Sequence, residues 1–69
     1  MTARQPIHVR ALGVNTTEFD GPGVLAAINT LGVPYMRSRH GKAWQVPGRH
    51  ADDVMALLES RRYRLVVTL

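Results

Sequence analysis

Glycine and proline residues divide this sequence into short apolar segments, and this division limits the folds that the chain can adopt. Residues 7–12 alternate between apolar and polar side chains, which is typical of a half-buried strand. Residues 13–23 are rich in Gly, Asn and Thr, which predicts a loop. Two segments with helical spacing follow, and each leads into a segment with strand character. The further strands are expected at 35–39, 43–46 and 63–69.

The two helices are predicted from apolar residues that recur every three or four positions. The first runs over 24–31, where Gly32 is expected to cap its C-terminal end and Pro34 follows. The second lies between Pro47-Gly48 and Tyr63. The buried positions that these patterns predict are Val24, Leu25, Ile28 and Leu31 in the first helix and Ala51, Val54, Met55, Leu57 and Leu58 in the second.

The resulting order of elements is strand, helix, strand, strand, helix, strand. In a chain of 69 residues this order predicts an α+β fold, the ferredoxin-like βαββαβ sandwich. Its antiparallel sheet has the strand order 4-1-3-2, with two helices on one face. The chain is long enough for one compact unit, so residues 1–69 are expected to form a single domain.

The predicted hairpin around His40-Gly41-Lys42 has two possible registers. A two-residue turn would place Arg37 on the same face as Trp44, whereas a three-residue loop would place Met36 there. Because one buried face normally selects the register, we expect the three-residue loop. Trp44 is then predicted to lie in the core.

The basic residues point to an anionic partner. The formal net charge is +4, and eight of the nine basic residues are Arg, which binds phosphate and carboxylate groups in a bidentate manner. The expected open sheet face carries no acidic residue, because all five acids fall in the first loop or the second helix. It carries His8, Arg10, Tyr35, Arg37, Arg39, Gln45 and Arg64. Such charge segregation is typical of nucleic-acid binding. The alternative is that arginine reflects a GC-rich coding sequence.

A second stretch, Asp20-Gly21-Pro22-Gly23-Val24-Leu25, resembles the D-x-P-G-x-L motif of ACT domains. These are ferredoxin-like regulatory modules, and the resemblance extends to the order of elements. It implies amino-acid binding at a dimer interface by Asp20, Gly21, Pro22 and Gly23. The alternative is a loop that only starts a helix. The chain as a whole is also similar to small proteins of actinobacteria and their phages, which makes a regulator that binds a host protein a further hypothesis.

No catalytic or metal-binding pattern stands out. His8, His40 and His50 lack the paired spacing of metal ligands, and the five acidic residues show no obvious acid–base pairing. We therefore expect a binding module without enzymatic activity, cofactor or metal.

The sequence also favours self-association. Residues 65–69 carry no charged side chain and are expected to form a sheet edge, which can pair with a second copy of the chain. A homodimer is therefore predicted. No segment approaches the roughly 20 apolar residues of a membrane span, so no membrane partner is expected. The absence of cysteine fits a reducing compartment, so a cytoplasmic location is predicted.

Overall fold

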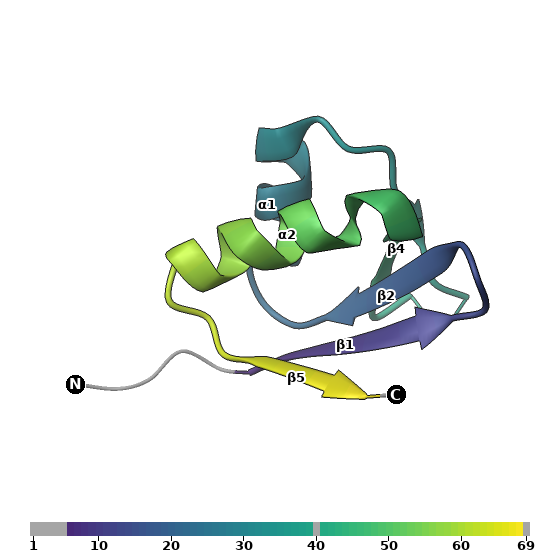
Figure 1. Cartoon of the computed structure of the whole chain (residues 1–69), viewed down its shortest axis with the longest axis horizontal. Coiled ribbons are helices and arrows are strands. Elements are labelled where there is room, and N and C mark those ends of the chain that lie inside the picture. Colours follow the sequence, from purple (N-terminus) through teal and green to yellow (C-terminus); the bar gives the residue numbers. More distant parts are fainter. Residues whose placement is uncertain (1–5, 40, 69) are drawn as a thin grey trace.

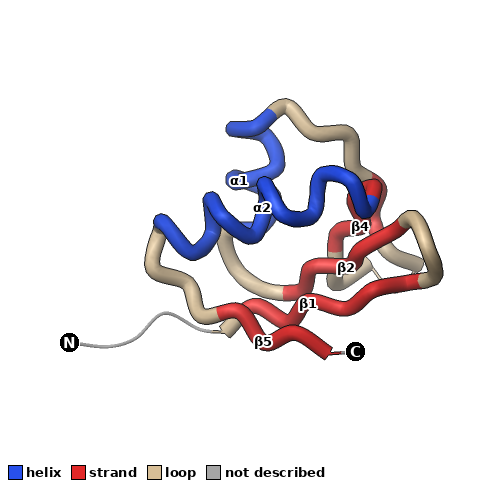
Figure 2. The backbone as a smooth tube through the Cα atoms, viewed as in Figure 1, coloured by secondary structure: helices blue, strands red, loops and turns tan. Residues whose placement is uncertain are grey.

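The computed structural model describes residues 6–39 and 41–68, which form an α+β fold of two layers. Both helices lie on the same side of a sheet, as Figures 1 and 2 show. The elements are β1 (Ile7–Leu12), β2 (Thr16–Asp20), α1 (Val24–Leu31), β3 (Met36–Arg37), β4 (Trp44–Pro47), α2 (Gly48–Ser60) and β5 (Leu65–Thr68).

The sheet has five strands in the order β3-β4-β2-β1-β5. The β1–β5 pair is parallel, and the other three neighbouring pairs are antiparallel. Without β2 the order would be that of the ferredoxin-like sandwich. The expectation of a four-stranded antiparallel ferredoxin-like sheet is therefore wrong in strand count and strand order, because an additional strand lies between β1 and β4. It is also wrong in strand direction, because β5 runs parallel to β1.

The additional strand comes from the segment that was predicted to be a loop. Gly13 adopts a left-handed conformation, with φ of 72°, and turns the chain back after β1. β2 then pairs with β1 from Thr16 opposite Leu12 to Asp20 opposite His8. Its inward side chain Phe19 is fully buried and is the largest such side chain in the core. One aromatic residue among polar neighbours gives little periodic signal, although it anchors the strand.

The core lies between the sheet and the helices. Its largest fully buried members are Ile7, Phe19, Val24, Ile28, Val46, Val54 and Leu58. The buried positions predicted for the helices are confirmed in part, since Leu31 is exposed and Ala27 is buried in its place. The predicted cap is confirmed, because Gly32 is left-handed at φ 69° and its backbone N–H donates to Asn29.

The β3–β4 hairpin does not have the register that we expected from the sequence. Met36 pairs with Gln45 and Arg37 pairs with Trp44, which is the register of the two-residue turn. Ser38 holds the hairpin, because its N–H donates to the Ala43 carbonyl at 2.9 Å and its Oγ accepts from the Ala43 N–H at 3.1 Å. The expected three-residue loop assumed one buried face. β3 is a short edge strand whose two residues are both exposed, so turn geometry sets the register.

Candidate functional site

The sheet face opposite the helices carries a mixture of charged, polar and apolar side chains. The strand registers place on it His8, Arg10 and Leu12 of β1, Thr16, Glu18 and Asp20 of β2, Met36 of β3, Gln45 and Pro47 of β4, and Val66 and Thr68 of β5. Three of the seven residues predicted for the open face, His8, Arg10 and Gln45, therefore lie there within strands.

The prediction that this face lacks acidic residues is wrong. Glu18 and Asp20 lie on it, because the segment that contains them is strand β2 and not a loop. Glu18 lies opposite Arg10, whose Nη2 is 3.4 Å from Glu18 Oε1. The Glu18 side chain is only 11% exposed. The arginine at the centre of the face thus already has an acidic neighbour.

One half of the open face nevertheless forms a cationic depression, which we call the basic hollow. Its volume is about 320 Å³, and its lining residues are Arg10, Leu12, Glu18, Met36, Arg37, Ser38, Arg39 and Gln45. Three arginines and one glutamate contribute to this lining. Four residues predicted for nucleic-acid binding, Arg10, Arg37, Arg39 and Gln45, are brought together here.

The other half of the face differs in charge. A second depression of about 350 Å³ is lined by His8, Val9, Arg10, Glu18, Asp20 and Thr68. Both acidic side chains of the face therefore border it. Arg64 lies next to β5, at the sheet edge opposite β3. The structure thus separates His8 and Arg64 from the residues of the basic hollow.

An aromatic and cationic cluster adjoins the basic hollow. The Arg37 guanidinium carbon lies 5.1 Å from the centre of the Trp44 ring, within the range of a cation–π interaction. Tyr35 contacts the same indole edge-on, with ring centres 5.5 Å apart and planes at 80°. Tyr35 and Arg37 were expected on the open face, but the observed register places them with Trp44. Trp44 was predicted to be core, yet it is only partly buried.

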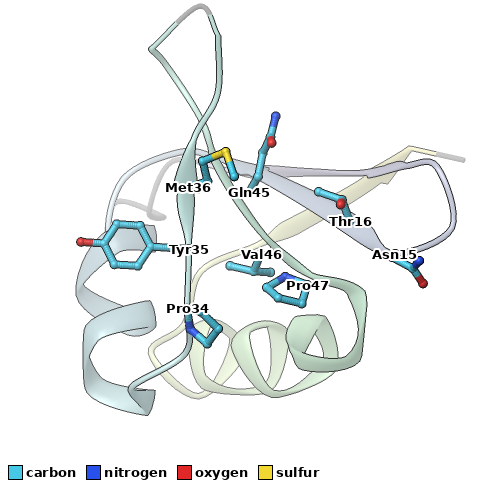
Figure 3. A pocket seen from close by; sticks show the side chains of 8 residues that line it. All are labelled: Asn15, Thr16, Pro34, Tyr35, Met36, Gln45, Val46 and Pro47. Carbon is cyan, nitrogen blue, oxygen red and sulfur yellow. The ribbon is translucent and has the colours of Figure 1, made fainter.

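A third depression, which is uncharged, borders the basic hollow, and we call it the edge groove. It has a volume of about 240 Å³ and lies beside β3, as Figure 3 shows. Its lining residues are Asn15, Thr16, Pro34, Tyr35, Met36, Gln45, Val46 and Pro47. Met36 and Gln45 line both depressions, so the two are neighbours. No local pattern predicts this groove, because its residues come from separate segments that only the folded chain brings together.

The loop that resembles the ACT motif is held by internal packing. A Cβ atom on Gly21 would lie 3.0 Å from the Ile7 Cα. A Cβ on Gly23, whose φ is 80°, would lie 2.6 Å from the Tyr63 ring. Both glycines are therefore required by contacts within the chain, while Asp20 at the end of β2 and Pro22 are exposed.

Metal-binding groups are not gathered in the part of the chain that the structure describes. No three His, Asp or Glu side chains of residues 6–39 and 41–68 lie close enough to share an ion. His40 lies outside the described residues. Neither of the described helices is long and apolar enough to cross a membrane.

Comparison with protein-family models, curated proteins and solved structures finds no match for this chain.

Proposed function

We propose that the protein binds single-stranded nucleic acid through the basic hollow and the adjoining β3–β4 hairpin. The observation that carries the proposal is the Arg37–Trp44 stack, which lies beside a depression lined by two further arginines. Proteins that bind single strands combine cations that follow the phosphates with aromatic rings on which bases stack.

The charge distribution supports this site. Residues 21–51 contain no Asp or Glu, and this stretch includes the whole hairpin with Arg37, Arg39 and Lys42. The one carboxylate of the basic hollow belongs to Glu18, which Arg10 contacts. Positive charge is therefore concentrated at the β3 edge, where a phosphate backbone is attracted.

The aromatic residues favour a single strand over a duplex. Tyr35 is 46% exposed and Trp44 is partly buried, so both rings have surface that a ligand can reach. The face of a base is available for stacking on a protein ring only where the base is not stacked within a duplex. Stacking tolerates any base, so the aromatic rings themselves are expected to add little sequence preference.

We also propose that the protein is a homodimer formed through β5. Among the strands that the structure describes, β1 is the one neighbour of β5, which therefore lies at the edge of this sheet. Val67 on it is 55% exposed. An apolar edge strand pairs readily with another strand, and β5 of a second copy would pair with its free backbone N–H and C=O groups. The hairpin lies at the opposite edge and would stay accessible in each copy.

The binding proposal is tested by titrating fluorescein-labelled single-stranded DNA and RNA and measuring anisotropy at 50 and 200 mM salt. The variant R37Q/R39Q/K42Q removes three charges from the hairpin. The matched control R61Q/R62Q/R64Q removes three charges next to β5. Thermal melting followed by circular dichroism shows whether both variants keep the fold.

We expect the hairpin variant to bind at least about tenfold more weakly than the wild type. The slope of log Kd against log salt should fall by about 0.7 for each phosphate that the variant no longer neutralises. The control should lose less affinity and keep the larger slope. Equal losses of affinity in both variants would point to general charge attraction and contradict the assigned site. No binding by the wild type at 50 mM salt would refute the function and favour an acidic protein surface as the partner.

A further inference from the structure

The edge groove and the basic hollow are adjacent but differ in chemistry. None of the eight residues that line the edge groove is charged, whereas three arginines line the basic hollow. A phosphate is stabilised by arginine and gains little in an uncharged groove. The groove therefore suits a neutral part of the same ligand, next to the point where its phosphate is held.

We infer that the edge groove accepts one unstacked base of the strand whose phosphates bind in the basic hollow. This inference rests on the proposed function. The volume of about 240 Å³ is below the 300–1,000 Å³ that is typical of pockets for whole small molecules, so it fits a single ring system. Pro34, Met36 and Pro47 supply apolar walls for the faces of that ring.

Three side chains of the groove lining carry an amide or hydroxyl group on the β2–β4 side. Asn15 ends the β1–β2 turn, Thr16 begins β2, and Gln45 of β4 lies beside Met36, as Figure 3 shows. The Gln45 amide can both donate and accept hydrogen bonds, as the edge of a base requires. Gln45 also lines the basic hollow, so it lies where the base joins the backbone. We therefore assign to Gln45 the role of distinguishing one base from another.

The experiment compares strands that carry equal charge but different bases. Anisotropy is measured with homopolymers of each base and with an abasic strand of the same length. The variant Gln45→Leu removes the amide and keeps a side chain of similar size. The control His8→Leu removes a polar group from the other half of the same face, outside the groove.

We expect the abasic strand to bind the wild type about tenfold more weakly than a normal strand, with an unchanged salt slope. Gln45→Leu should reduce the differences among the homopolymers and leave the salt slope intact, while His8→Leu should change neither. If Gln45→Leu keeps the full ranking of bases, the groove inference is overturned while the proposed function stands. If the abasic strand binds as well as the others, no base is being bound, and both the groove inference and the stacking on which the proposed function rests are overturned. Absence of wild-type binding to every strand would overturn both.

Discussion

Arg37 lies directly opposite Trp44 across the β3–β4 hairpin, with its guanidinium carbon 5.1 Å from the centre of the indole ring. The pair connects edge strand β3 with β4, where the Trp44 side chain is partly buried. Arg37 is also one of the residues that line the basic hollow.

Replacing Arg37 by Gln should have little effect on stability. A cation–π interaction at an exposed site contributes about 0.5–1 kcal/mol, and Arg37 is exposed. We therefore expect R37Q to lower the free energy of unfolding by less than about 1 kcal/mol in urea titrations that follow Trp44 fluorescence. A larger loss of stability would mean that the pair holds the hairpin in place and does not serve binding alone.

Phe19 should be the most sensitive core position. It is fully buried on the strand that local patterns do not predict, so truncation leaves a large cavity. We expect F19A to cost about 3–5 kcal/mol, which is enough to unfold most of a domain this small. F19L keeps a large apolar side chain and should cost clearly less than F19A. V14A at a site that is 95% exposed should be neutral, and comparable destabilisation by F19A and V14A would contradict the position of β2.

Gly23 and Gly32 provide a matched pair of left-handed glycines. Both have positive φ, at 80° and 69°, but a Cβ on Gly23 would meet Tyr63 whereas one on Gly32 would meet nothing within 4 Å. G32A should therefore cost only the left-handed strain of about 1–2 kcal/mol. G23A should cost clearly more, and adding Tyr63→Ala should recover part of the difference. Chemical denaturation of the three variants measures this, and equal costs for the two glycines would show that Tyr63 does not pack against the loop.

The proposed dimer should depend on Val67. A charge on an edge strand opposes pairing with a second strand, so V67K is expected to give a monomer. Val14→Lys adds the same charge in the β1–β2 turn and should leave the dimer intact. Light scattering at high concentration distinguishes the two masses. A monomeric wild type would refute the dimer. A dimeric V67K would show that the interface does not involve β5.

The sequence predicted those parts of the fold that have strong local signals. Both helices, the Gly32 cap, the hairpin and the edge position of the last strand follow from periodicity and from glycine and proline placement. β2 was missed because its polar residues look like a loop until β1 and β4 pair with them on either side. That pairing is a tertiary effect, and it outweighs the weak local preference of residues 16–20.

The candidate site was predicted only in part, for the same reason. Residues such as Arg10 and Gln45 keep their face, since each lies within a strand with one clear buried side. Arg37 changes face because β3 has no buried side, and a shift of one residue reverses every side chain. Glu18 lies on the open face because its segment forms β2. The charge of this face therefore depends on the presence of β2 and on the register of the β3–β4 hairpin, and local patterns determine neither.

The parallel pairing of β1 with β5 also governs the order of events in folding. Ile7 pairs with Leu65, so this contact closes a loop that contains most of the chain. Such long-range contacts are slow to form, because much chain entropy is lost before any pairing is gained. During synthesis β1 can pair with β2 early, whereas the opposite edge of β1 stays unpaired until β5 has been made. In a ribosome-bound chain that stops before Leu65, β1 is therefore an edge strand, although it is an inner strand of the complete sheet. We expect chaperones to bind the chain at that stage.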